Sequence, residues 1–384
     1  MRILFIWHGA ADPNNFPLFD AMIAERDLDI LILTPPLLDD RMMVFRMRGP
    51  VTRIDKRSGS RYRIVSGWTL NPRSLGYMVH LDLPARIAAF DPDIVHVVAE
   101  ASTLLAAEAA ILRMTIARRP RLVLHVIQNI MVDYRWPWPV VEKFALSRAD
   151  AAVAYNPGAR GVLRRRGFRK PIFLRPFGAG DFSLPSGSSV RRRMGRGTPV
   201  IGWNGRMFMG KGLHVLIKAS SLMRRPHRLL IVGDGPRREI EQELARKLGV
   251  ESRITWAGMV PIKLIGEYYR AMDIFTHPAI TRPPDMPAWK EQFARTLPEA
   301  MLCGLPTVGA RSGEIPWVLG DGALIVPERN PLALARALDR LVASPRLRKD
   351  LGQKARKRAF ANFTWRVAGR EMAEIWRKIL NRPA

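Results

Sequence analysis

The sequence predicts an α/β protein with two doubly wound domains. Short apolar segments alternate with amphipathic segments at helical spacing, which indicates parallel sheets with helices on both faces. A length of 384 residues is too great for one simple core. In addition, a strand, a glycine-containing turn and a helix recur at the start of each half, as doubly wound domains require.

The first domain is expected to span residues 1–178 and to hold six strands. The chain opens with an apolar run of about six residues that His8 and Gly9 end, which favours a first strand over a signal peptide. The later strands are apolar runs of similar length that precede helical patterns. The expected strands are 3–7, 29–33, 94–98, 122–127, 151–154 and 172–174.

A linker is expected at residues 179–197, because this segment is rich in Gly, Ser and Pro and then turns basic. The second domain follows at 198–364. Residues 365–384 carry apolar side chains at helical spacing, from Trp365 to Ile379, and predict an amphipathic helix. The expected strands of the second domain are 199–203, 228–232, 254–256, 274–277, 307–310 and 323–326.

The charge balance points to anionic partners. The chain carries 62 Lys and Arg against 34 Asp and Glu, a net charge of +28, which favours a membrane surface, nucleic acid or phosphorylated substrates. Nucleic acid is the least expected partner, because no RNP or zinc-finger spacing accompanies the charge. The most apolar long window, 94–112, contains Glu100 and Glu108, so we expect any membrane contact to be peripheral. A single cysteine, Cys303, fits a reducing, cytoplasmic compartment.

Residues 41–63 concentrate eight basic side chains around the turn Ser58-Gly59-Ser60, and their alternation predicts a hairpin with a basic face. Two interpretations are open. The face contacts anionic head groups or an acidic acceptor, or it is an ordinary solvated surface of an Arg-rich protein. The basic residues are Arg41, Arg46, Arg48, Arg53, Lys56, Arg57, Arg61 and Arg63.

Glu291 and Glu299 lie on either side of an expected helix start. Pro298 suits the first turn of a helix, and the helix dipole favours an acid there. The N–H groups of that turn form a seat for a phosphate. The spacing of the two acids is by itself weak evidence for such a site, and the sequence motifs around them are more specific.

At these residues the chain resembles the retaining nucleotide-sugar glycosyltransferases of family 4, which have the GT-B fold of two Rossmann-like domains. The resemblance covers residues 200–330 and is looser before them. It implies that the last helix crosses back to the first domain; the alternative is a helix that closes the second domain. The matching sequence motifs are VIGWNGR (200–206) with Lys211-Gly212, LIVGDGP (230–236), AMDIFTHP (271–278), the acid pair, AMLCGLP (300–306) and SGEIP (312–316).

The resemblance implies a donor site for a UDP- or GDP-sugar. Arg206 and Lys211, beside the turn at Gly205, would offset the diphosphate charge and take the place of a metal or other cofactor. Glu291 would hold hydroxyls of the donor sugar and Glu299 the ribose. Phe293, Ala294, Arg295 and Thr296 would offer backbone N–H groups, although close relatives usually carry Gly where Ala294 stands. Asp234 and Glu314 would border the pocket, with turn chemistry as the alternative for Asp234.

The first domain would bind the acceptor. Gly9 follows the first strand in a reduced form of the family's glycine-rich loop. Val98 stands where many relatives have a histidine, so that function is either lost or supplied by Glu100 or His125; for His125, a place in the core is the alternative. Gln128 and Asn129 end a strand at the edge where ligands bind in such sheets. Residues 134–139 carry two tryptophans, which suit a sugar or a membrane interface as well as simple packing.

The expected activity is therefore metal-independent, retaining transfer of a sugar to an acceptor hydroxyl of a lipid-linked or cell-envelope glycan, at the inner face of the cell membrane. Two other classes stay open. One is another GT-B enzyme, such as an inverting transferase or a sugar phosphorylase. The other is a non-catalytic homologue that binds nucleic acid or membrane through its charge.

Overall fold

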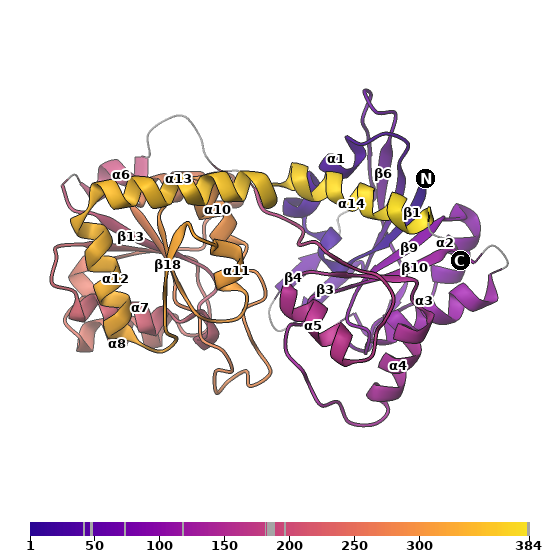
Figure 1. The fold of residues 1–384 in the computed structure, drawn as a ribbon, viewed down its shortest axis with the longest axis horizontal. Helices are drawn as coiled ribbons and strands as arrows, with labels where there is room; N and C mark the ends of the chain where they lie inside the picture. Colours follow the sequence, from indigo (N-terminus) through magenta and orange to yellow (C-terminus); the bar gives the residue numbers. More distant parts are fainter. Residues whose placement is uncertain are drawn as a thin grey trace. The chain divides into compact units, whose positions relative to one another are not determined.

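The computed structural model describes residues 1–40, 43–46, 49–72, 74–116, 119–180, 182, 189–195 and 197–381 (Figure 1). The chain divides into two compact units. The first comprises Met1–Phe177 and Trp365–Ala384, and the second comprises Gly178–Thr364. Each unit is a sheet with helices on both faces, which confirms the predicted fold class.

The first unit is built on an eight-stranded sheet in the order β12-β11-β10-β9-β1-β2-β6-β5. All neighbours in it are parallel except β5 and β6. Two small antiparallel ribbons, β3–β4 and β7–β8, stand outside it. The strands are β1 (Arg2–Ile6), β2 (Asp29–Thr34), β3 (Leu37–Asp40), β4 (Met43–Arg46), β5 (Val51–Ile54), β6 (Arg61–Ser66), β7 (Thr69–Leu70), β8 (Val79–His80), β9 (Ile94–Val98), β10 (Arg121–Val126), β11 (Ala151–Ala154) and β12 (Ile172–Leu174).

The helices of the first unit cover this sheet on both faces, and apolar clusters of the described residues pack between sheet and helices. Capping residues begin several helices as their sequence predicts: Thr103 accepts the N–H of Ala106, and Asn156 that of Ala159. The helices are η1 (His8–Ala11), η2 (Pro13–Asn15), α1 (Phe16–Ile23), α2 (Leu83–Phe90), α3 (Leu104–Thr115), α4 (Trp138–Arg148), α5 (Pro157–Arg165) and α14 (Trp365–Leu380).

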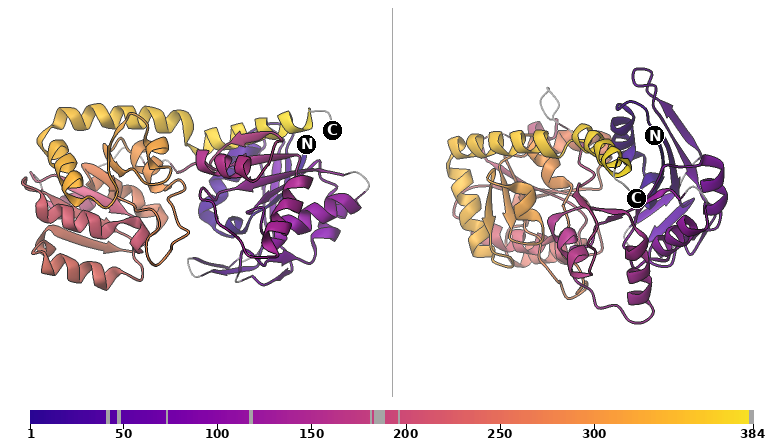
Figure 2. Two further views of the ribbon diagram at one scale, coloured as in Figure 1. Left: turned by 60° about the horizontal axis from the view of Figure 1, so that its bottom comes forward. Right: turned by 45° about the vertical axis from the view of Figure 1, so that its right-hand side comes forward.

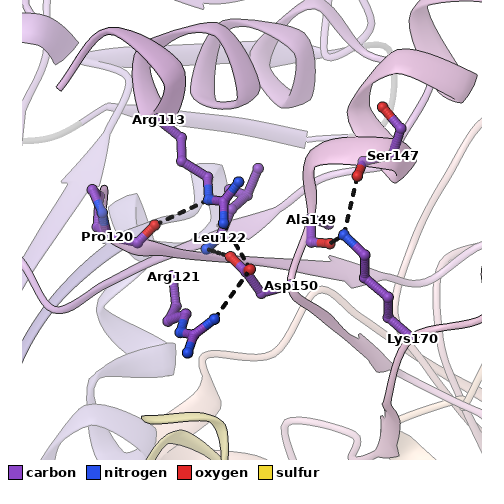
Figure 3. Close-up of polar contacts among 8 residues, drawn as sticks. All are labelled: Arg113, Pro120, Arg121, Leu122, Ser147, Ala149, Asp150 and Lys170. Atoms are coloured by element: carbon purple, nitrogen blue, oxygen red, sulfur yellow. Dashed lines mark hydrogen bonds and ion pairs between the residues drawn. The ribbon is translucent and has the colours of Figure 1, made fainter. Parts of the chain in front are cut away.

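Asp150 fixes the amino-terminal ends of β10 and β11 (Figure 3). Its carboxylate accepts the N–H of Leu122 at 2.8 Å and pairs with Arg113 of α3 at 2.7 Å. Lys170 donates to the carbonyls of Ser147 and Ala149, at 3.0 and 2.6 Å, and so satisfies the last turn of α4. These bonds fix the amino-terminal ends of the strands. The residues predicted to bind the acceptor lie at the opposite, carboxyl-terminal ends.

The basic segment forms the predicted hairpin, with β5 and β6 antiparallel around the turn. Arg53 pairs with Asp20, Arg61 pairs with Asp29, and Arg63 lies over the ring of Phe90. This part of the basic face is therefore partly neutralised within the unit. Arg41 and Arg48 lie outside the described residues, and nothing is described of the Arg46 side chain.

The last helix belongs to the first unit, as the fold class predicts. α14 packs along α1, and both lie over the same side of the first sheet (Figures 1 and 2). Trp376 of α14 is fully buried against Phe5 of β1 and His96 of β9. The close approach depends on Gly369, because a Cβ there would lie 2.5 Å from the carbonyl carbon of Ala21 and 2.7 Å from the nitrogen of Met22.

The second unit holds a parallel six-stranded sheet in the order β15-β14-β13-β16-β17-β18. Successive strands are added on one side of β13 up to β15 and on its other side from β16 onward, and such a switch point is where open α/β sheets bind ligands.

Helix α6 lies in the expected linker, where Arg191 pairs with Asp273 at 2.8 Å. The strands are β13 (Val200–Asn204), β14 (Arg228–Val232), β15 (Ile254–Gly258), β16 (Ile274–His277), β17 (Thr307–Ala310) and β18 (Ala323–Val326).

The helices of the second unit pack on both faces of this sheet (Figure 1). They are α6 (Ser189–Met194), η3 (Met209–Lys211), α7 (Leu213–Leu222), α8 (Arg238–Lys247), η4 (Glu251–Arg253), η5 (Ile262–Leu264), α9 (Ile265–Ala271), α10 (Thr296–Leu302), α11 (Ile315–Leu319), α12 (Pro331–Ala343) and α13 (Pro345–Asn362).

Replacing Gly369 by alanine should destabilise the first unit, because the added methyl group meets the backbone of α1. We expect a loss of about 1–3 kcal/mol, the usual cost of overpacking, measured as a lower Tm by calorimetry. Gly161→Ala in α5 is the matched control, since a Cβ there meets nothing within 4 Å. The control should gain up to about 1 kcal/mol from helix propensity. Equal gains in both variants would contradict the proposed packing.

Candidate active site

The carboxylate of Glu291 lies at the centre of the switch point. The Lys211 ammonium group, after β13, donates to its Oε2 at 2.8 Å. The His277 ring, at the end of β16, lies with Nε2 2.8 Å from the same oxygen. The Glu291 side chain is buried. Two neighbouring strands of the sheet thus place a cation and an imidazole on one acid.

These neighbours keep Glu291 ionised. Burial alone would raise the pKa of its carboxyl group, but the charge of Lys211 and the bond from His277 outweigh burial and hold that pKa well below its usual range. Burial lowers the pKa of His277, although Glu291 opposes that effect. Because the carboxylate accepts, the proton of a neutral His277 lies on Nε2. The buried acid therefore presents a fixed negative charge.

Lys211 lies between two aromatic rings. Its Nζ is 5.5 Å from the ring centre of Trp289 and 5.7 Å from that of Phe208, and the two rings meet edge to face. Cation–π attraction at such distances helps to hold an ammonium group in place. Gly210 permits the arrangement, because a Cβ there would lie 2.6 Å from the Phe208 ring and 2.8 Å from the Trp289 ring.

Gly205 and Arg206 follow β13 on the same loop. Gly233, with φ of +111°, passes so close that a Cβ on it would lie 2.0 Å from the Gly205 carbonyl oxygen. Asp234 ties the two turns together, since its carbonyl accepts the N–H of Met207 at 2.8 Å. The carboxylate of Asp234 accepts from Gly235 and pairs with Arg238 of α8 at 2.6 Å, which favours the turn-chemistry alternative for this residue.

Glu299 is buried in the first turn of α10 and is held by a second set of residues. Tyr269 donates its hydroxyl to Glu299 Oε2 at 2.8 Å, and Asn204, the last residue of β13, donates to the same hydroxyl at 2.9 Å. Arg295 lies 3.7 Å from the other carboxylate oxygen. Burial raises the pKa of Glu299, while Arg295 and Tyr269 oppose this effect.

The segment between the two acids is strained at one residue. Ala294 has φ of +49°, in the left-handed region that alanine rarely adopts. Its carbonyl accepts the N–H of Leu297 at 2.7 Å, and Arg295 is the cap residue that precedes the first residue of α10, Thr296. Phe293 packs into the core against Phe363. The backbone therefore keeps the conformation that a glycine would provide, even though the residue is alanine.

Glu314 and Gly313 lie directly against Glu291. The N–H of Glu314 donates to the Glu291 carbonyl at 3.0 Å. Gly313 has φ of +52°, and a Cβ there would lie 2.0 Å from that carbonyl oxygen. The structure thus brings Glu314 next to the central acid of the site.

In the first unit, Glu100, Gln128 and Asn129 come together at the carboxyl ends of β9 and β10. Glu100 accepts the N–H groups of Ile127 and Gln128 at 2.9 and 2.8 Å, and Tyr134 donates to the Gln128 side chain at 2.7 Å. Burial raises the pKa of Glu100 to about 7, against the effect of those two N–H groups. Asn129 is buried beside them. Gly9 lies in η1 after β1, and its carbonyl accepts from Asn15.

His125 instead lies in the core, which favours the alternative interpretation. The Trp376 N–H donates to His96 Nδ1 at 3.0 Å, so a neutral His96 carries its proton on Nε2 and donates to His125 Nδ1 at 3.2 Å. His125 Nε2 then donates to the Arg175 carbonyl at 3.2 Å. Burial lowers the pKa of His125 to about 3 and that of His96 well below its usual range. Both ring nitrogens of His125 are occupied within the unit.

The sequence analysis missed several residues that build this site. Tyr269 and Asn204 hold Glu299, and Trp289 and Phe208 surround Lys211. Asn204, Tyr269 and Trp289 carry no signal for these roles, because their contacts join segments far apart in the chain. Phe208 lies only three residues before Lys211, but its residue type does not mark it as a neighbour of a cation. For His277, which ends the expected strand 274–277, the sequence leaves a structural histidine and a ligand contact both open. Among the residues that the structure describes, no group of three or more His, Cys, Asp or Glu could hold a metal ion.

The surroundings of Glu291 and Glu299 lie in a part of the chain that matches a known protein family. Residues 192–358 match the model of the family described as glycosyl transferases group 1. A GDP-mannose-dependent alpha-(1-6)-phosphatidylinositol monomannoside mannosyltransferase from Mycolicibacterium smegmatis is 32% identical over 192 residues, 48% of this chain and 50% of the relative. A D-inositol 3-phosphate glycosyltransferase from Corynebacterium kroppenstedtii is 30% identical over 205 residues, 49% of this chain and 43% of the relative. The chain thus spans about half the length of the curated relatives it matches.

Solved structures with a similar fold cover nearly the whole chain. Sucrose-phosphate synthase from Thermosynechococcus elongatus has a TM-score of 0.73 at 18% identity, with 99% of each chain covered. The HepE protein of Anabaena, solved in complex with UDP, has a TM-score of 0.72 at 19% identity, with 98% of this chain and 100% of that chain covered. The predicted GT-B fold and the predicted resemblance to glycosyltransferases are confirmed.

Replacing Ala294 by glycine should stabilise the second unit, because glycine adopts positive φ without steric cost. We expect a gain of about 1 kcal/mol, seen as a Tm higher by a few degrees. Ala337→Gly, in the middle of α12, is the control and should lose about 1 kcal/mol. A Tm that falls equally in both variants would show that Ala294 is not strained.

Proposed function

We propose that this protein is a retaining family 4 glycosyltransferase that moves a sugar from a UDP- or GDP-sugar to an acceptor hydroxyl. The observation that carries the proposal is the ionised Glu291 between Lys211 and His277 at the switch point of the second sheet. A buried charge held by a strand end and the loop after the neighbouring strand is costly to maintain, and such arrangements gather at functional sites. The family match over residues 192–358 supports the same site.

In this proposal the donor contacts divide between two acids. Glu291, kept ionised by its neighbours, accepts hydrogen bonds from sugar hydroxyls. Glu299 accepts from the ribose, with Tyr269 and Asn204 holding its orientation. Lys211 has three N–H donors, so it can bond a phosphate oxygen while one of them stays on Glu291. Arg206, on the loop after β13, adds a second cation.

The chemical step needs charge stabilisation more than a protein base. The bond from the anomeric carbon to the leaving phosphate breaks, and the acceptor oxygen attacks from the same face. The acceptor proton passes to the leaving phosphate oxygen, so the step balances within the two substrates. Arg206 and Lys211 stabilise the negative charge that grows on the diphosphate. These cations supply what a metal would supply elsewhere, and the proposed reaction is metal-independent.

The acceptor is proposed to bind the first unit through Glu100, Gln128 and Asn129, with Gly9 nearby. A lipid-linked or cell-envelope glycan is the acceptor class we favour, because the net charge of +28 suits an anionic membrane surface. The mycolicibacterial relative is named for a phosphatidylinositol mannoside, which supports the same class. No helix in the described ranges is long and apolar enough to cross a bilayer. We propose a cytoplasmic location at the inner face of the membrane.

A donor should raise the Tm of the wild-type protein, and Glu299→Ala should abolish that rise. At a donor concentration of about 100 times Kd, binding stabilises by about 2.7 kcal/mol, equivalent to several degrees. A panel of UDP-, GDP- and ADP-sugars identifies the base. Glu239→Ala is the control, since Glu239 is also an acid in the first turn of a helix and lies at the surface. No shift with any donor would leave the non-catalytic homologue as the better proposal.

The product should keep the anomeric configuration of the donor sugar, because attack and departure share one face. Anomeric proton NMR of the first product formed measures this directly. An inverted product would favour another GT-B transferase. A sugar 1-phosphate formed from a glycan and free phosphate would favour a phosphorylase.

A further inference from the structure

The ribbon β7–β8 in the first unit turns an apolar face outward. Thr69 pairs with His80 and Leu70 with Val79, and the Leu81 N–H donates to the Trp68 carbonyl at 2.8 Å. Side chains alternate between the two faces of such a ribbon. Trp68, Leu70 and Leu81 therefore share one face, and they are 76%, 50% and 56% exposed.

The inner face of the ribbon is polar and buried, and it fixes the ribbon on the unit. His80 is fully buried, and its N–H donates to Glu108 of α3 at 2.9 Å. The Trp68 N–H donates to Asp82 at 3.0 Å. Gly67 allows this close packing, because a Cβ there would lie 2.5 Å from the His80 ring. The polar-in, apolar-out arrangement is the reverse of an ordinary surface ribbon.

The apolar surface continues toward α4. Tyr77, half exposed just before β8, meets the Trp138 ring edge to face at 4.9 Å. Trp136 is 83% exposed before α4. Helix α3 lies beside α4 (Figure 1), and it also packs against β8. Large exposed apolar side chains gathered on neighbouring elements mark an interaction site. We call this surface the apolar rim: Trp68, Leu70, Tyr77, Leu81, Trp136 and Val140.

Charge distinguishes the possible occupants of the rim. A second copy of a chain with net charge +28 is repelled, whereas an anionic surface is attracted. Each cation near an anionic bilayer adds about 1 kcal/mol of attraction. Arg135, next to Trp136 in the sequence, and Lys143, three residues after Val140, are both exposed. Tryptophan and tyrosine are also the side chains that prefer the boundary between lipid and water.

We propose that the apolar rim docks this protein on a bilayer with anionic head groups. Trp68, Leu70, Leu81 and Trp136 enter the head-group region, while neighbouring cations meet lipid phosphates. The inference deepens the proposed function, on which it rests for its purpose: it names the surface that brings the enzyme to a lipid-linked acceptor. It also places the membrane contact on the rim, apart from the basic hairpin β5–β6.

Vesicle co-sedimentation tests the rim. The full-length protein is compared with the variant Trp68→Ser, Leu70→Ser, Leu81→Ser on phosphatidylcholine vesicles with and without phosphatidylglycerol. Each exposed side chain contributes part of its burial energy, so we expect at least a tenfold loss of binding to anionic vesicles. The control is Met259→Ser, Leu264→Ser, Leu222→Ser in the second unit, whose side chains are 76%, 53% and 48% exposed. The control should bind as wild type does.

Three outcomes would overturn the proposal. Wild type does not bind anionic vesicles, the rim variant binds as well as wild type, or light scattering shows a wild-type dimer that the rim variant loses. The Tm of each variant shows that it folds. Donor-induced thermal shifts separate this inference from the proposed function, since the rim variant should keep them. Vesicle binding that needs the rim in a protein without any donor shift would support docking and reject sugar transfer.

Discussion

The buried carboxylate of Glu291 is the constraint on which the candidate site depends. It draws together the loop after β13 through Lys211 and the end of β16 through His277. The backbone carbonyl of Glu291 accepts a hydrogen bond from the N–H of Glu314, so the segment before α11 is bound to the same residue. A buried charge must be fully compensated, since leaving one partner out costs several kcal/mol. The geometry of three separate segments is therefore set by one residue, through its side chain and its backbone carbonyl.

Much of the fold and part of the site could be predicted from the sequence. Long apolar strands such as β9 and β14 are recognisable because parallel strands are buried on both faces. The roles suggested for Glu291 and Glu299 came from the resemblance to family 4, which is carried by sequence motifs in the same order along the chain. The ribbon β7–β8 was not predicted, because two-residue strands carry no periodicity. Tyr269 could not be assigned to Glu299, since thirty residues separate the partners and only the folded sheet brings them together.

The departures from the family pattern have different physical outcomes. At Ala294 the backbone keeps a left-handed conformation and accepts the strain of a β-carbon. At Val98 the chain has no histidine, and the two histidines nearby, His96 and His125, are used in the core. Their hydrogen bonds run in one direction, from the Trp376 indole to the Arg175 carbonyl. Two neutral histidines thus tie α14 to the middle of the first sheet, and Glu100 alone of the two candidates stays at the strand edge.

The position of α14 has a consequence for how the protein is made. The second unit is one continuous stretch, Gly178–Thr364, but the first unit lacks α14 until residues 365–380 are synthesised. During translation the apolar face of α1 and the Trp376 site beside His96 stay uncovered while nearly two hundred further residues emerge. Domains usually fold in order from the amino terminus. Here the unit that emerges first is the one completed last, so a ribosome that stops before α14 releases a chain with exposed core.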